Sequence, residues 1–169
     1  MRIETERLII TKFDLSMAES VHINSLDEDK RRFVPDEVFE TVEEAKETLE
    51  YLIAQYDGEK GSYVYPILLE DGKNIGYVQA VLIDEGWEIG YHIGKEFTKQ
   101  GYATEAVKAF LPIIMKKLGI DVMIGICLAD NTASRIVMER SGFIKNFEGE
   151  GNYQGELRKI CRYTYKIQP

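Results

Sequence analysis

The stretch "KQGYATEAVKAF", residues 99–110, decides the fold prediction. Gly101 and small residues stand directly before a long amphipathic helix, which is predicted over 102–118. The apolar residues of this helix recur at three- and four-residue spacing, which is typical of one buried face. Gly119 predicts the end of the helix, and Pro112 predicts a bend within it.

A turn of glycine and small residues directly before a helix is a candidate anion-binding site. The first N–H groups of a helix have no intrahelical partner, and the helix dipole makes that end positive. Gly101 lacks a Cβ, so the main chain can approach a ligand closely, and Ala103 and Thr104 keep the first turn small. The segment therefore fits a phosphate group. A plain strand-to-helix turn explains the same residues equally well from this stretch alone.

The rest of the chain predicts a mixed α/β sheet in one domain, residues 1–169. The strand-like runs are 7–13, 62–70, 74–83, 87–94, 122–129, 143–148 and 157–167. Short links between the runs within 62–94 predict an antiparallel meander. Further helices are predicted from a cap at Ser16, after Thr41, and after Asp130 or Asn131. The expected fold class is a mostly antiparallel sheet flanked by helices.

Composition excludes several classes of protein. At 169 residues and 44% apolar content the chain can bury a core, and no run is long enough to cross a membrane. Charges at the N-terminus leave no apolar centre for a signal peptide. Cys127 and Cys161 have no metal-like spacing, so we expect a cytoplasmic protein with reduced thiols and no metal. A net charge of −8 argues against nucleic acid as a partner, whereas a monomer and a homodimer both stay open.

A second informative stretch is "NTASRIVMERSGF", residues 131–143. Asn131 can use its side-chain amide to cap the helix or to contact a ligand, and the cap is the simpler interpretation. Ser134 lies one turn further on the same side, where it is either a ligand contact or an ordinary exposed serine.

Together the two stretches resemble the GNAT superfamily of acetyl-CoA-dependent N-acetyltransferases. The shared pattern is strand, G-x-A turn, helix, strand, N-x-x-S helix and G-F strand. The opening "ETERLIITKF" (4–13) and the runs "EIGYHI" (88–93) and "GYATEA" (101–106) are similar, more narrowly, to the branch containing the ribosomal-protein alanine N-acetyltransferases. The resemblance covers essentially the whole chain.

This resemblance implies acetyl-CoA as the donor. In the family, the turn before the long helix holds the CoA pyrophosphate on main-chain amides, and a splayed strand, here 87–94, pairs with the pantetheine arm. The donor-binding residues implied are Ile93, Gly94, Thr98, Lys99, Gln100, Gly101, Tyr102, Ala103, Thr104, Asn131 and Ser134. Thr98 and Lys99 depart from the usual pattern, which has Arg or Gln and then Gly, although Lys99 adds a charge beside the phosphates.

The implied reaction is direct attack of an amine on the acetyl thioester. It needs a neutral amine, a donor to the carbonyl oxygen and a proton for the leaving thiolate. A main-chain N–H near Ile93 is the expected donor. Many family members place a tyrosine acid where this chain has Met138; Ser141 and Tyr102 replace it by proximity only, and water is an equal alternative.

Two residues are candidates for the base. Glu88 and His92 are an even number of residues apart on one predicted strand, so they share a face. Glu88 is the preferred candidate. A cross-strand ion pair is the alternative role for Glu88, and a partly exposed strand position is the alternative for His92.

The acceptor is an amine, and a weak set of catalytic side chains favours an α-amine of a protein N-terminus or of a small molecule. An α-amine has a pKa of about 7.8 against about 10.4 for lysine, so deprotonating lysine at neutral pH costs about 3.5 kcal/mol more. The acidic segment 27–50 either lines the acceptor side or forms a solvated helix face. A non-catalytic acyl-CoA-binding domain of the same fold is the alternative function.

Overall fold

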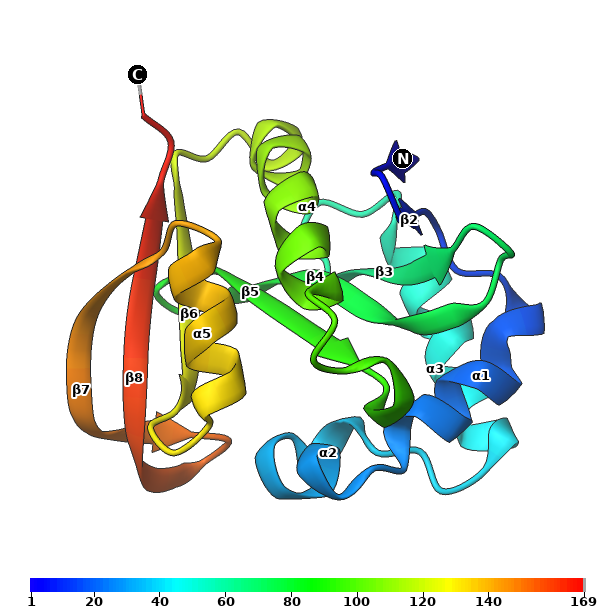
Figure 1. Cartoon of the computed structure of the whole chain (residues 1–169), viewed down its shortest axis with the longest axis horizontal. Coiled ribbons are helices and arrows are strands. Elements are labelled where there is room, and N and C mark those ends of the chain that lie inside the picture. Colours follow the sequence, from blue (N-terminus) through cyan, green and yellow to red (C-terminus); the bar gives the residue numbers. More distant parts are fainter. Residues whose placement is uncertain (169) are drawn as a thin grey trace.

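One eight-stranded sheet organises residues 1–168, the part of the chain that this computed structural model describes (Figure 1). The strands are β1 (Ile3–Glu4), β2 (Leu8–Ile10), β3 (Tyr63–Leu69), β4 (Asn74–Ile83), β5 (Gly86–Ile93), β6 (Val122–Leu128), β7 (Ile144–Tyr153) and β8 (Glu156–Lys166). The helices are α1 (Ala18–Ser25), α2 (Glu28–Phe33), α3 (Val42–Gln55), α4 (Tyr102–Leu118) and α5 (Thr132–Arg140). Short 3-10 turns lie at Leu15–Met17, Pro35–Glu37 and Lys95–Phe97.

The strand order is β1-β2-β3-β4-β5-β6-β8-β7. Every neighbouring pair is antiparallel except β5 and β6, which run parallel. The antiparallel meander predicted over 62–94 is confirmed by β3, β4 and β5. The predicted fold class, a mixed and mostly antiparallel sheet flanked by helices, is confirmed as well.

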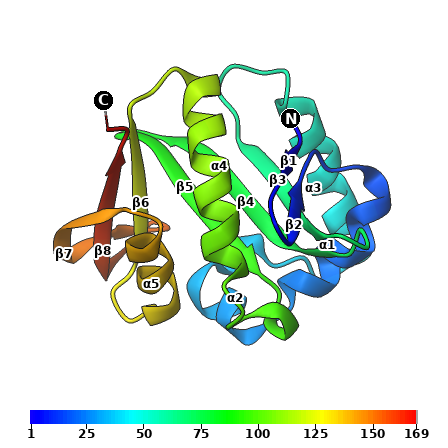
Figure 2. The same cartoon turned by 45° about the horizontal axis from the view of Figure 1, so that its top comes forward.

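Each face of the sheet has its own core. On one face, the apolar stripe of α4, including Val107 and Phe110, packs in a cluster with Val78 and Ile89 of the sheet, and Figure 2 shows α4 lying along β4 and β5. On the other face, α1 and α3 contribute to a smaller cluster. Its buried members are Phe13, Ala18, Leu49 and Val64. The helices thus cover both faces of the centre of the sheet.

The helix ends follow the sequence signals closely. Gly119 ends α4 in the left-handed conformation (φ 66°), and α4 continues through Pro112 without interruption. Thr41 caps α3 by accepting the N–H of Glu44 at 3.1 Å. The side-chain oxygen of Asn131 caps α5 by accepting the N–H of Ser134 at 3.2 Å.

Two local predictions are wrong, and one helix was not predicted. The cap before α1 is Asp14, whose carboxylate accepts the Ser16 N–H at 2.8 Å, so a 3-10 turn precedes the helix. The acidic segment contains an additional helix, α2, which begins because Asp27 accepts the Lys30 N–H at 2.7 Å. Strand β7 extends to Tyr153, well beyond the predicted end at 148.

Candidate active site

The turn before α4 has the geometry that the sequence suggested. Gly101 is the N-cap residue with φ 82°, and no side chain caps the helix. Lys99 also lies in the left-handed region (φ 63°), which is uncommon for a residue with a Cβ and is often found at functional sites. The first free N–H groups of α4 are therefore presented by a turn of two left-handed residues, with Gln100 exposed between them.

A hollow of about 590 Å³ adjoins this turn. Its lining residues are Thr5, Glu6, Gly101, Thr104, Glu105, Lys108, Ala109 and Arg140. The hollow begins at the helix start, and its charged lining is two cations, Lys108 and Arg140, and two carboxylates, Glu6 and Glu105. Thr98 lies just before the turn and donates its hydroxyl to the carbonyl of Lys95 at 2.9 Å, so that hydroxyl already has a local acceptor.

Strands β5 and β6 separate next to this turn. Their register has one pair, Glu88 with Ile124, and Figure 2 shows the strands diverging from there. The Gly94 N–H donates to the Ile75 carbonyl at 2.8 Å, toward β4. Because main-chain groups alternate in direction along a strand, those of Tyr91 and Ile93 point toward β6 instead. The N–H of Ile93 therefore points toward the opening.

The α5 side of the opening is lined by Ser134. Its Oγ lies 2.9 Å from the hydroxyl of Tyr91, which also donates to the Ser134 carbonyl at 3.0 Å. Tyr91 thus reaches from β5 across the separation to α5. Asn131 uses its side chain as the helix cap, which is the simpler of the two roles predicted for it.

Replacing Ser134 with alanine tests whether this hydroxyl helps to bind acetyl-CoA. Loss of one hydrogen bond is expected to raise the KM for acetyl-CoA by about threefold to tenfold and to leave the KM for the amine nearly unchanged. Steady-state kinetics with each substrate varied in turn measures both constants. Ser20→Ala is a matched control, because Ser20 is a half-buried serine of α1. Its hydroxyl donates to the Met17 carbonyl in the preceding 3-10 turn at 2.9 Å and accepts from Asn74 at 3.1 Å. An equal change in both KM values for Ser134→Ala would contradict the prediction.

Met138 occupies the position where a tyrosine acid is usual. It is 2% exposed, and a Cβ built on Gly125 of β6 would lie 2.4 Å from its sulfur, so Met138 fills the space over that glycine. Ser141 lies almost one turn beyond and is 6% exposed; its Oγ is buried without a hydrogen-bond partner among residues 1–168. Tyr102 lies at the opposite end of the opening, at the start of α4. Ser141 therefore stays a candidate acid, and Tyr102 fits the phosphate turn better.

Glu88 and His92 share the sheet face opposite α4, in register with Val81 and Tyr77 of β4. Burial raises the pKa of Glu88 to about 7, and the charges of Glu37 and Glu85 add to the rise while Arg162 opposes it. A carboxylate with a pKa near neutrality is suited to general-base catalysis.

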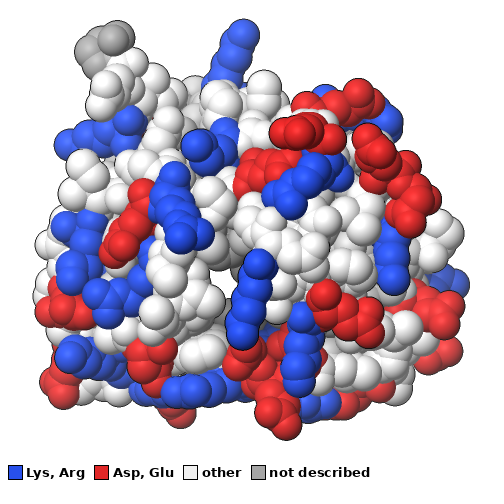
Figure 3. Space-filling model, in the orientation of Figure 1, with Lys and Arg blue, Asp and Glu red and all other residues white. Residues whose placement is uncertain are grey.

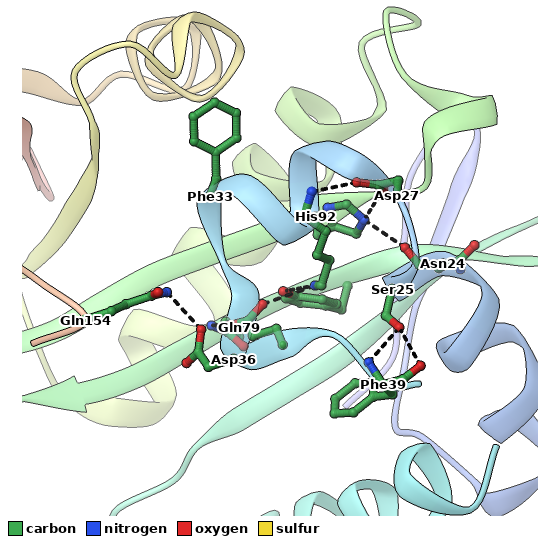
Figure 4. Close-up of polar contacts among 12 residues, drawn as sticks. Asn24, Ser25, Asp27, Phe33, Asp36, Phe39, Gln79, His92 and Gln154 are labelled. Carbon is green, nitrogen blue, oxygen red and sulfur yellow. Dashed lines mark hydrogen bonds and ion pairs between the residues drawn. The ribbon is translucent and has the colours of Figure 1, made fainter. Parts of the chain in front are cut away.

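His92 is engaged in a structural contact. Its Nε2 lies 3.1 Å from the carbonyl of Asn24 and 3.0 Å from Oδ2 of Asp27 (Figure 4). Both partners accept hydrogen bonds, so Nε2 carries a hydrogen and cannot accept a proton in this arrangement. Burial alone would raise the pKa of Asp27, but the hydrogen bonds from His92 and the Lys30 N–H hold that pKa below its usual range. His92 therefore fastens the start of α2 to β5.

A buried lysine, which the sequence did not single out, completes this attachment. The Lys30 side chain is 1% exposed, and its ammonium donates to Tyr77 at 2.6 Å and to Glu37 at 3.1 Å. Gln79 donates to the other oxygen of Glu37 at 3.4 Å. Glu37, one of the groups that raises the pKa of Glu88, is thereby held over the sheet.

The segment 27–37 also contacts the opposite side of the opening. Tyr153 donates its hydroxyl to the Phe33 carbonyl at 2.6 Å, and Gln154 donates to Asp36 at 2.8 Å, both from the β7–β8 turn. Arg32 pairs with Asp130, just before α5, at 2.6 Å. Part of the acidic segment therefore covers the region of Glu88. Figure 3 shows a hollow between the regions of α5 and α2, with charges of both signs around it.

A groove of about 530 Å³ lies on the same sheet face as Glu88. Ile124 is the register partner of Glu88. Ile126 lies two residues after Ile124 on β6, so its side chain is on the same sheet face. The residues that line the groove are Glu85, Ile126, Asn146, Phe147, Glu150, Gly151, Asn152, Ile160 and Arg162. The groove thus joins an apolar floor to charged walls close to the candidate base.

Within residues 1–168, no three His, Cys, Asp or Glu side chains are grouped as metal ligands. None of the helices described is long and apolar enough to cross a membrane.

Comparisons with known proteins agree with this geometry. The sequence profile described as "Acetyltransferase (GNAT) domain" matches residues 7–144. The chain is 28% identical over 163 residues to the uncharacterized N-acetyltransferase YnaD of Bacillus subtilis (strain 168), covering 90% of this chain and 91% of that protein. A GNAT-family acetyltransferase structure from Bacillus anthracis matches with a TM-score of 0.83 and 26% identity over 98% of both chains. RimL, a ribosomal L7/L12 α-N-protein acetyltransferase solved with CoA, matches with a TM-score of 0.83 and 20% identity over 99% of this chain and 98% of its own.

Fold and site together define a protein that transfers an acyl group from CoA. The chain belongs to the GNAT acetyltransferase family, because the profile covers most of its length. It is an acetyl-CoA-dependent N-acetyltransferase whose acceptor is an amine. The resemblance stated from the sequence is confirmed.

Proposed function

We propose that this enzyme acetylates an α-amine, either that of a protein N-terminus or that of a small molecule. The observation that carries the proposal is Glu88, a carboxylate with a pKa of about 7 on the sheet face opposite α4, at the point where β5 and β6 part. An α-amine has a pKa of about 7.8, so such a base is matched to it, whereas a lysine amine would need about 3.5 kcal/mol more for deprotonation.

In this proposal the pyrophosphate of acetyl-CoA lies on the N–H groups of residues 99–104, and its pantetheine arm lies between β5 and β6. Gly101 has no side chain in the path, and Lys99 lies two residues before it. Lys108 and Arg140 line the hollow beside the turn together with the carboxylates Glu6 and Glu105. The thiol end then lies toward the Glu88–Ile124 pair, which closes the opening. The Ile93 N–H is the candidate donor to the pantetheine arm or the thioester carbonyl.

The residues of the chain perform three tasks in the reaction. Glu88 accepts the proton of the amine, directly or through water. The nitrogen lone pair attacks the carbonyl carbon, and the nitrogen loses its second proton as the C–S bond breaks. The thiolate takes up that proton, relayed through Ser141 or through water. The groove beside Glu88, with Ile126, Phe147 and Ile160 in its lining, accommodates the acceptor atoms that follow the amine.

The compartment proposed is the cytoplasm. Cys127 and Cys161 are free thiols in directly opposite register on β6 and β8. Unpaired cysteines in that arrangement suit a reducing environment.

A thiol-release screen with acetyl-CoA tests the acceptor class. The panel holds peptides with free N-termini, polyamines and aminoglycosides. It includes a peptide with the N-terminal sequence of ribosomal protein L7/L12, because the neighbour RimL is named for that substrate. We expect release with an α-amine, and none with the same peptide blocked at its N-terminus and carrying a free lysine. Release with the blocked lysine peptide alone would refute the α-amine proposal. CoA binding without release on any amine would favour the non-catalytic alternative.

A further inference from the structure

The opening motif "ETERL" (4–8) contacts a part of the chain that is distant in sequence. It forms the turn between β1 and β2, closed by the Leu8 N–H donating to the Thr5 hydroxyl at 3.0 Å. This turn packs against the start of α4, about 100 residues later in the chain. Residues of the motif therefore meet the proposed phosphate turn.

The contact centres on Glu105, in the first turn of α4. One carboxylate oxygen accepts from the Thr5 hydroxyl at 2.6 Å and the Arg7 N–H at 3.1 Å. The other accepts from Arg7 Nε at 2.7 Å and pairs with Nη2 at 2.6 Å. Burial alone would raise the pKa of Glu105, but these hydrogen bonds hold the pKa below its usual range. Glu105 is therefore a negative charge, fully engaged by the motif.

Arg7 also touches the turn itself. Its Nη1 donates to the Gln100 carbonyl at 2.9 Å, and its guanidinium lies 4.4 Å from the centroid of the Tyr102 ring. A Cβ built on Gly101 would lie 3.5 Å from Nη2. The guanidinium thus contacts the residues on both sides of Gly101 and leaves the ligand side of the turn open.

We propose that Arg7 is the positioning residue of the donor-binding turn. It holds the left-handed conformations of Lys99 and Gly101, so that the N–H groups of α4 converge on the pyrophosphate, and it neutralises Glu105, whose charge would otherwise repel that anion. This inference rests on the placement of acetyl-CoA given under Proposed function. The inference gives a role to the ETERL motif, none of whose residues takes part in the proposed reaction.

Isothermal titration calorimetry with CoA, and displacement of CoA by pantetheine, test the inference without any acceptor. Pantetheine has the thiol arm but none of the phosphates. Arg7→Gln is expected to weaken CoA binding by about tenfold or more and to leave the pantetheine affinity unchanged. Arg2→Gln is the matched control, since Arg2 belongs to the same segment but pairs with Glu4 at 2.9 Å on the surface. Its CoA affinity should equal that of the wild type.

The outcomes separate this inference from the function on which it rests. Equal losses for CoA and pantetheine in Arg7→Gln, or no loss for either, would overturn the positioning role while donor binding stands. Wild-type protein that binds no CoA would overturn the donor placement and this inference with it. If Arg7→Gln does not fold, Arg7→Lys carries the test, because lysine keeps the charge and loses the planar fork. Unchanged CoA affinity in that variant would also overturn the proposal.

Discussion

Replacing Gly101 with valine is expected to weaken CoA binding by about 10- to 100-fold. Gly101 has φ 82°, a conformation that costs a residue with a Cβ about 1–2 kcal/mol and a β-branched residue more. A Cβ there would meet Arg7 Nη2 at 3.5 Å, an ordinary contact, so packing within the protein does not forbid the side chain. The loss should therefore arise from the turn leaving its conformation and from the side chain entering the phosphate path. Calorimetry with CoA measures it.

Gly119→Val is a matched control on the same helix. Gly119 ends α4 with φ 66°, and nothing lies within 4 Å of a Cβ built there. The two variants should lose melting temperature to a similar extent, since both force valine into the left-handed region. Only Gly101→Val should lose CoA affinity. Unchanged CoA affinity in a folded Gly101→Val protein would refute the proposed location of the pyrophosphate.

The donor side of the site could be predicted because its signals are local. A glycine turn, an amphipathic helix and a capping asparagine each act within a few residues, so sequence spacing specifies them. Gly101 accordingly begins α4 and Asn131 caps α5, as the sequence predicted. The separation of β5 and β6 follows from strand pairing and was predicted only through family resemblance.

The acceptor side could not be predicted in the same way. Lys30 can be buried because Glu37 and Tyr77, the latter distant in sequence, accept hydrogen bonds from its ammonium. No pattern within 27–50 predicts these partners. His92 was a candidate base, yet Asp27 and Asn24 make its Nε2 a donor. Long-range polar contacts of this kind depend on the finished fold. Arg7 is a further example, since its role is visible only against Glu105.

The face shared by Glu88 and His92 was correctly deduced from strand alternation, but the difference between the two residues was not. Alternation says which side of a sheet a residue takes and nothing about burial or neighbours. Glu88 gains its raised pKa from desolvation and from Glu37, which a separate segment delivers. Only the structure therefore gives a physical reason to prefer Glu88 over His92 as the base.

Glu88→Gln is expected to lower turnover at neutral pH by about 10²-fold or more, in the range of general-base catalysis. Glutamine keeps the shape and removes the basicity. In the wild type, the rate should rise with pH as Glu88 loses its proton around its pKa of about 7. The variant lacks this titration, and its deficit should shrink at higher pH, where the amine deprotonates unaided. Glu85→Gln tests the origin of the raised pKa: the rise in rate should move to lower pH, because Glu85 helps to raise the pKa of Glu88.

The pH dependence of protein stability is a second, independent test of the raised pKa of Glu88. The pKa of Glu88 rises on folding from its usual 4.5 to about 7, so the folded state prefers the protonated form. The stability that this preference contributes is fully present below pH 4.5 and is lost as the pH rises through about 7. Glu88→Gln should therefore melt at nearly the wild-type temperature in acid and above it at alkaline pH. A Glu88 held by a cross-strand ion pair would behave oppositely, since its glutamine variant would lose melting temperature at neutral pH. If Glu88→Gln keeps the turnover of the wild type between about pH 6 and 9, Glu88 takes no part in the reaction, and Ser141 or water moves the protons.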